Sequence, residues 1–179
     1  MNEDQKEIQK AVGDLSQSEA ESSQADLSHI SKEMLDKGLL PKNALGLSDN
    51  LIEGIYGQAY RLYNTGKYKE SSQLFRMLIM IDATEPKYSM GLAACFHMMK
   101  EYQNAINTYA ICGIMEPDSP IPHYHSSDCY LQMNDPISAA IALEMAIKRA
   151  SDRQEFQALK DRATLTLDAI KKKQEASKK

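Results

Sequence analysis

The sequence predicts an all-α fold that is built from three consecutive helix–turn–helix repeats of about 34 residues each. Residues of similar size recur at this step and in phase. The large ones are Leu62, Phe96 and Tyr130, then Phe75, Tyr109 and Leu143, then Tyr68 and Tyr102. The small ones are Ala59, Ala93 and Ser127, then Ser71, Ala105 and Ala139. The chain has only 8 glycines and 6 prolines, and the prolines lie at the expected turns and helix starts and near the N-terminal linker, as suits an all-helical chain.

A period of about 34 residues is that of the tetratricopeptide repeat, a pair of antiparallel helices that stacks into a helical solenoid. We place the three repeats at about residues 52–85, 86–119 and 120–153, inside a repeat domain that spans residues 48–176. One unit cannot bury its apolar face alone, so the repeats must stack and must be capped at both ends. The sequence predicts an N-terminal helix before the repeats and a C-terminal capping helix after them.

The helices of the repeats follow from the apolar periodicity and from the turn residues. The first begins near Ser48, Asp49 and Asn50, where Asn50 and Glu53 have capping-box spacing, and it ends near Asn64 before Gly66. The others are expected at about 68–81, 87–99, 102–115, 121–133 and 136–150. The capping helix is expected at about 153–173, with Ser151 and Asp152 as its N-cap, because apolar residues recur there at helical spacing.

The N-terminal region divides into two parts. Residues 1–25 are rich in Ser, Glu and Gln, and we expect a disordered polar leader. Residues 26–47 are expected to form a helix and an apolar linker. This segment either caps the first repeat or pairs with a second subunit to form a homodimer, and the sequence leaves both readings open. The apolar residues that would form the dimer interface are Leu27, Ile30, Met34, Leu35, Leu39 and Leu40.

Composition excludes several classes of function. The net charge of −4 does not suggest a nucleic-acid surface. No apolar run approaches the about 18 to 20 residues that would span a bilayer, and the polar start lacks a signal-peptide core, so we expect a cytoplasmic protein that does not insert into membranes. No catalytic or phosphate-binding motif occurs, so we expect no enzyme activity and no cofactor.

We expect no metal site and no disulfide. The three cysteines, Cys95, Cys112 and Cys129, occupy repeat positions where Cys fills space in a core, and no C-x-x-C pair occurs. His123 and His125 lie two residues apart, a spacing that separates the two rings around a helix. His123 is expected to be a packed core histidine.

A binding groove is expected where the first helices of the repeats face inward. In tetratricopeptide repeats the inward positions are 2, 5, 9 and 12 of each unit. Here they hold Glu53, Tyr56, Tyr60 and Tyr63, then Lys87, Met90, Ala94 and His97, then Ile121, Tyr124, Asp128 and Leu131. The three tyrosines of the first repeat form one aromatic ladder on one helix face. The ladder is either part of the core or a wall for an extended apolar peptide, and we favour the wall because Ala59 and Leu62 already supply the core positions.

Two further predictions concern charged groups in the groove, a carboxylate clamp and the role of Asp128. Grooves that hold the acidic C-terminus of heat-shock chaperones carry Lys or Arg at position 5 and Asn at position 9, whereas this chain has Tyr56 and Tyr60 there. A carboxylate clamp is therefore disfavoured. The Asp128 carboxylate either accepts a hydrogen bond from a peptide backbone or is simply solvated.

The repeats and the C-terminal segment resemble the class II chaperones of bacterial type III secretion, the SycD/LcrH, IpgC and SicA type. The resemblance covers about residues 48–176. Its most specific part is the extra residues at Ala83 to Glu85, together with the stretches LYNTGKYKESSQLFRMLIMIDATEPKYSMGLAACFHMMKEYQNAINTYA and EFQALKDRATLTLDAIKKKQE.

The resemblance implies a chaperone that binds hydrophobic translocator proteins in the bacterial cytoplasm and keeps them soluble before export. In this family an extended segment of the translocator fills pockets of the groove, and the matching positions here are Tyr56, Tyr60, Tyr63, Tyr68, Met77 and Ile81. Family members often dimerise through the N-terminal helical region. This chain departs from the family in its polar leader and in Met90, Met98 and Met99. The alternative function is a scaffold or regulator that joins proteins without chaperone activity.

Overall fold

The computed structural model describes residues 41–176, and the chain divides into two units at residues 48 and 49. The predicted leader (residues 1–25), the helix expected at residues 26–37 and the six residues proposed for a dimer interface lie outside the described residues. Within the first unit the described part holds one short helix, α2 (Pro41–Ala44).

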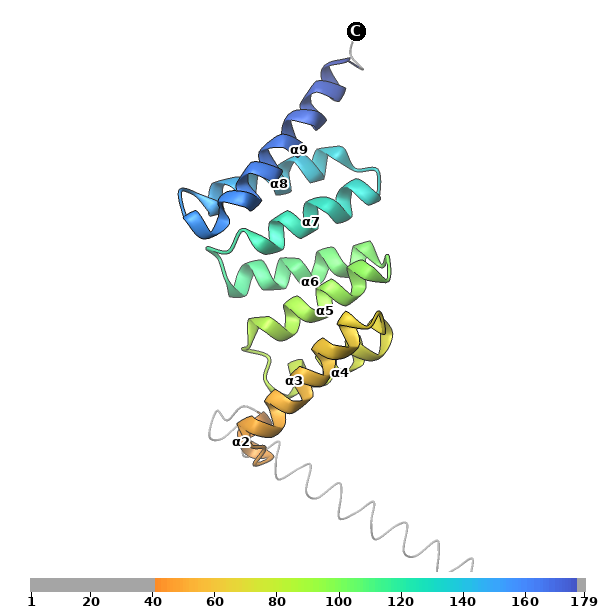
Figure 1. The fold of residues 1–179 in the computed structure, drawn as a ribbon, viewed down its shortest axis with the longest axis vertical. Coiled ribbons are helices and arrows are strands. Elements are labelled where there is room, and N and C mark those ends of the chain that lie inside the picture. Colours follow the sequence, from red (N-terminus) through yellow and green to blue (C-terminus); the bar gives the residue numbers. More distant parts are fainter. Residues whose placement is uncertain (1–40, 177–179) are drawn as a thin grey trace, which may run out of the picture. The chain divides into compact units, whose positions relative to one another are not determined.

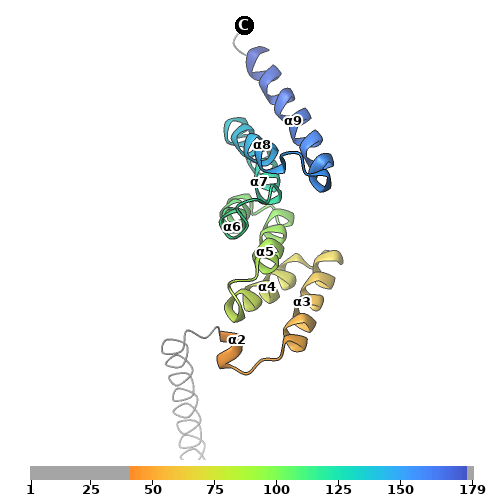
Figure 2. The ribbon, with the colours of Figure 1, turned by 90° about the vertical axis from the view of Figure 1, so that its left-hand side faces the viewer.

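The second unit is a succession of antiparallel helices, and no strand occurs between residues 41 and 176 (Figure 1). Each helix packs against the next along the chain, so the hairpins stack in sequence order (Figure 2). The helices are α3 (Asp49–Asn64), α4 (Tyr68–Ile81), α5 (Pro86–Met98), α6 (Tyr102–Met115), α7 (Ile121–Gln132), α8 (Pro136–Ala150) and α9 (Gln157–Ala176). The predicted all-α tetratricopeptide fold is confirmed.

The same helix-ending turn recurs in all three repeats. Gly66, Lys100 and Asn134 occupy the same position of successive repeats, and all three have left-handed backbone conformations with φ of 79°, 63° and 57°. After each of them the next amide donates back to a carbonyl five residues earlier, as from Lys67 to Leu62 at 2.9 Å and from Glu101 to Phe96 at 2.9 Å. This is the Schellman arrangement, which satisfies carbonyls that the helix end leaves unpaired.

The core lies where the helices cross, and the repeated small residues mark the crossings. Ala59, Ala93 and Ala105 are fully buried. Ser71 takes the same role at the α3–α4 crossing, because its hydroxyl donates to the carbonyl of Ala59 at 2.8 Å. The large residues predicted beside these crossings are buried too: Phe75, Tyr109 and Leu143.

The predicted start of the first repeat helix agrees with the structure, whereas that of the capping helix is wrong. Helix α3 begins at Asp49, within the predicted residues 48–50, and Asn50 lies inside its first turn rather than at the N-cap. The capping helix α9 begins only at Gln157, after the 3₁₀ turn η1 (Gln154–Phe156). The left-handed conformation of Ser151 (φ 50°) ends α8 and turns the chain before that point.

The cysteines Cys95, Cys112 and Cys129 are buried free thiols, as expected of core residues. None of the helices described between residues 41 and 176 has the length and apolarity that a membrane crossing needs. The same residues contain no group of three His, Cys, Asp or Glu side chains placed to hold a metal ion.

Candidate peptide-binding groove

The tyrosine ladder borders a pocket between the first helices of repeats one and two. This tyrosine pocket has a volume of about 240 Å³. Helix α3 supplies one wall, α5 supplies the other, and one residue of α4 lies beneath them. The lining residues are Tyr56, Tyr60, Tyr63, Phe75, Lys87, Met90, Gly91 and Ala94. Five of the twelve residues predicted for the groove therefore share one cavity.

The tyrosines of the ladder differ in how far they belong to the core. Tyr56 contacts Phe75 edge-to-face, with ring centroids 6.1 Å apart, and lies 5.9 Å from Tyr88. Tyr60 stacks on Tyr56 at 6.5 Å but is 55% exposed. Tyr56 therefore packs partly in the core, whereas the ring of Tyr60 remains available to a ligand.

The position of Phe75 at the floor of the tyrosine pocket depends on a glycine that was not among the predicted site residues. A Cβ atom on Gly91 would overlap three ring carbons of Phe75. Phe75 thus approaches the backbone of α5 directly and reaches Tyr56 on α3. The available signal was a glycine in the middle of a predicted helix, where glycine is unfavourable by about 1 kcal/mol relative to alanine and so indicates a close approach.

A cation lies at the mouth of the tyrosine pocket. The ammonium of Lys87 donates to Glu53 at 3.0 Å and lies 4.7 Å from the centre of the Tyr56 ring. The hydrogen bond to Glu53 raises the pKa of the ammonium, which therefore stays charged. Position 2 of the first two repeats thus forms an ion pair between α3 and α5, and the cation–π contact holds it over the aromatic wall.

A cluster of polar and aromatic residues connects the first helices of repeats two and three. Nε2 of His97 on α5 lies 2.8 Å from Oδ2 of Asp128 on α7. The ring of His125 stacks on Tyr109, with centroids 5.5 Å apart, and also contacts His97 and Tyr124. Burial lowers the pKa of His125, and nearby His97 lowers it further against the opposing effect of Asp128. Asp128, expected to meet a peptide backbone or solvent, pairs with His97.

Four other predicted residues do not line the tyrosine pocket. Tyr68 contacts Tyr63, with ring centroids 5.4 Å apart. Ile81 is only 9% exposed, and Met77 lies on the exposed side of α4. Leu131 borders a separate cavity of about 750 Å³ beside α9.

These features define the class of protein: a tetratricopeptide solenoid with an aromatic pocket on its first helices. The tetratricopeptide repeat family model matches residues 52–83 and 86–114. Among curated proteins, the chain is similar to Low calcium response locus protein H of Yersinia pestis, with 32% identity over 129 residues that cover 72% of this chain and 77% of that protein. It is also similar to the chaperone protein SicA of Salmonella typhimurium, with 29% identity over 137 residues, 76% of this chain and 81% of that protein.

Solved structures give the same assignment. The type III secretion chaperone SycD of Yersinia enterocolitica, in complex with a peptide of the translocator YopD, has 30% identity and a TM-score of 0.69 over 72% of this chain and 98% of that one. PcrH, in complex with the chaperone binding region of PopD, has 28% identity and a TM-score of 0.69 over 72% of this chain and 97% of that one. The chain belongs to the LcrH/SycD family of type III secretion translocator chaperones.

Proposed function

We propose that this protein is a bacterial cytoplasmic chaperone that binds an extended apolar segment of a hydrophobic translocator protein and keeps the translocator soluble before export. The observation that carries the proposal is the open tyrosine pocket with the exposed ring of Tyr60. The family supports it, because SycD and PcrH have been solved with segments of the translocators YopD and PopD.

The size and chemistry of the tyrosine pocket suit one apolar side chain of the client. A volume of about 240 Å³ admits an aliphatic or proline side chain beside the stacked rings of Tyr56 and Tyr60. Burying such an anchor contributes about 1.5–3 kcal/mol. Two or three anchors along the groove, less the free energy of ordering the segment, correspond to a dissociation constant in about the micromolar range.

The protein needs no catalytic site for this role, and different parts of the chain serve client binding and self-association. The chaperone acts without enzyme activity and without a cofactor. The repeat domain at residues 48–176 carries the groove, the polar leader at residues 1–25 precedes it, and residues 26–47 form a homodimer contact through Leu27, Ile30, Met34, Leu35, Leu39 and Leu40.

The test is co-expression with the hydrophobic translocators of the same secretion system, scored as soluble complex. The informative variant is Tyr60→Ala, because this exposed ring contributes to the tyrosine pocket and little to the core. The matched control is Leu165→Ala, which removes a 70% exposed side chain on α9 away from the pocket. We expect the first variant to lower soluble complex about tenfold and the second to leave it unchanged.

Two results would count against the proposal. Equal amounts of complex with both variants, after circular dichroism has shown both to be folded, would place client binding away from the tyrosine pocket. A wild-type chain that binds translocators without increasing their solubility would favour the alternative, a scaffold that joins proteins without chaperone activity.

A further inference from the structure

The second helices of the repeats carry an exposed apolar row on the side away from the tyrosine pocket. Met77 on α4, Ile111 on α6 and Met145 on α8 occupy the same position of successive repeats, and all three are exposed. Exposed apolar side chains are unremarkable singly, but a contiguous group of them indicates an interaction surface. The row extends to neighbouring exposed residues: Met80, Ile114, Ile137 and Ile141.

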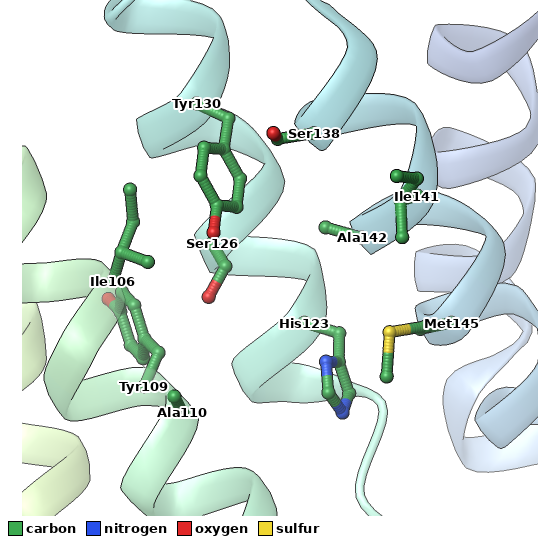
Figure 3. A pocket seen from close by; sticks show the side chains of 10 residues that line it. All are labelled: Ile106, Tyr109, Ala110, His123, Ser126, Tyr130, Ser138, Ile141, Ala142 and Met145. Carbon is green, nitrogen blue, oxygen red and sulfur yellow. The ribbon is translucent and has the colours of Figure 1, made fainter. Parts of the chain in front are cut away.

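A groove opens between α6 and α8 and shares Ile141 and Met145 with this row; we call it the outer groove. It has a volume of about 290 Å³. Ile106 and Ala110 of α6 form one wall, Ile141 and Met145 of α8 form the other, and α7 forms the floor (Figure 3). On α8, the residues at 137, 141 and 145 are four apart and follow one face of the helix over about 12 Å. A long apolar stripe between two helices suits a third helix, which places apolar residues at i, i+4 and i+7.

The floor of the outer groove holds a polar atom without a partner. Nε2 of His123 is buried and makes no hydrogen bond within the described part of the chain. Burial lowers the pKa of this histidine, and the charge of Arg149 lowers it further, so the ring is neutral near pH 7. Leaving such an atom unpaired is unfavourable, and a ligand group that hydrogen-bonds to it would remove that cost. The prediction of a packed histidine therefore holds for the burial of His123 but did not include its unpaired Nε2 atom.

Cations outnumber carboxylates near the floor of the outer groove. Lys148, Arg149 and Arg153, together with Asp118, line a second cavity beside the α6–α7 connection, and Arg149 is near enough to His123 to lower its pKa. The guanidinium of Arg149 donates to the carbonyl of Pro117 at 2.6 Å, and that of Arg153 donates to the carbonyl of Arg149 at 2.6 Å. Within residues 41–176 none of these three cations has an ion pair with a carboxylate, and their charge remains available to a partner.

We propose that the outer groove binds an acidic amphipathic helix of a partner protein, with apolar side chains between Ile141 and Ala110 and carboxylates toward Lys148, Arg149 and Arg153. The surface lies on helices other than the two walls of the tyrosine pocket. It therefore goes beyond the proposed function: the chaperone holds a translocator on one face and a second protein on the other. The leader of this chain is also acidic, but its three apolar residues at helical spacing, Ile8, Val12 and Leu15, are fewer than the seven exposed residues of the row.

The experiment measures binding of two synthetic probes to the full chain by fluorescence anisotropy. One probe is an 18-residue helical peptide (about 27 Å long) with Leu at i, i+4, i+7 and i+11 and Glu at the flanking positions. The other has Lys in place of every Glu. We expect the acidic peptide to bind at least about tenfold more tightly than the basic one, and higher salt to reduce the difference because it screens the charges.

Substitutions locate the site. Ile141→Gln removes an exposed apolar side chain of the outer groove, and its matched control is Leu165→Gln, a 70% exposed leucine on α9. Ile141→Gln should weaken the acidic peptide about tenfold or more, and Lys148→Glu should weaken it and strengthen the basic one. Tyr60→Ala should leave the affinity unchanged. Loss of translocator binding in Tyr60→Ala with peptide binding intact separates this site from the tyrosine pocket.

Four results would overturn the proposal. The first is equal affinity for both peptides, and the second is equal affinity of Ile141→Gln and Leu165→Gln. The third is tighter peptide binding after Ile8→Ser, Val12→Ser and Leu15→Ser together, which would identify the leader as the occupant. The fourth is self-association of the wild type that sedimentation velocity shows to be lost in Ile141→Gln, which would identify a second copy of this chain.

Discussion

The ring of Phe75 occupies the space that a side chain at Gly91 would need. Helices α4 and α5 therefore meet ring against backbone, and the same ring forms the floor of the tyrosine pocket and the edge-to-face partner of Tyr56. One glycine thus connects the packing of repeats one and two to the shape of the proposed client site.

Gly91→Ala should destabilise the fold and distort the tyrosine pocket. Alanine improves helix propensity by about 1 kcal/mol, but its methyl group overlaps three ring carbons of the buried Phe75. Overpacking of this kind costs about 1–3 kcal/mol. We expect a net loss of up to about 2 kcal/mol in the free energy of unfolding in urea, together with weaker client binding.

The matched controls for this substitution are Gly54→Ala and Gly57→Ala. Both glycines lie inside α3, and a Cβ atom on either meets no other atom within 4 Å. These variants should raise the free energy of unfolding by about 0.5–1 kcal/mol. A Gly91→Ala variant that is stabilised as much as they are would show that Phe75 has room to move.

The contact between His97 and Asp128 should contribute little to stability. The atoms are 2.8 Å apart, but half of the Asp128 side chain is exposed, so solvent screens the interaction. A double-mutant cycle of His97→Ala and Asp128→Ala should give a coupling energy of about 0.2–1 kcal/mol. A coupling energy well above this range would identify the pair as a principal link between repeats two and three.

The fold was predictable because each helix crossing requires small residues at the contact and large residues beside it, and both recur at the repeat period. Tyr68, Tyr102 and Pro136 begin α4, α6 and α8, as their recurrence at the same position of each repeat indicates. The turns also recur at a fixed position of the repeat. Lys100 and Asn134 adopt the left-handed conformation of Gly66 although neither is glycine. Their position in the repeat, rather than their residue type, was the informative feature.

The site was less predictable, because it depends on contacts between repeats. The α3 wall of the tyrosine pocket followed from helical spacing, and the α5 wall followed from the inward positions of the second repeat. Nothing in that spacing shows that Lys87 extends over Tyr56 or that Asp128 meets His97, since both contacts join residues of different repeats. Met77 was assigned to the groove from the family pattern, whereas its exposed position on α4 follows from the burial of Phe75 and Leu78 on the opposite side.

Acid should destabilise the repeat stack through its partly buried histidines. Burial is the main cause that lowers the pKa of both His123 and His125 from the ordinary 6.5. Below that value the unfolded chain binds protons that the folded chain does not, so the free energy of unfolding falls as the pH falls. The stabilisation is fully present above the unfolded-state pKa of about 6.5 and is lost progressively as the pH falls below it.

Urea unfolding at pH 7.5 and pH 5.5 tests this prediction. His125→Gln should reduce the difference between the two pH values, because glutamine does not titrate and still offers polar atoms beside Tyr109 and His97. A matched Gln132→His variant adds an exposed histidine at the end of α7 and should leave the difference unchanged. An unaltered pH dependence in His125→Gln would assign the acid sensitivity to other groups.

The three cysteines should report opening of the stack. Burial raises the pKa of Cys112 and of Cys129 to about 12, and it raises that of Cys95 as well. Each thiol is therefore protonated at pH 8 and shielded from reagents, since the thiolate is the reactive form. A disulfide exchange reagent should label all three quickly in urea and much more slowly in the native chain, at a rate that follows local unfolding of α5, α6 and α7. Rapid labelling of one thiol in the native protein would show that its helix opens independently of the stack.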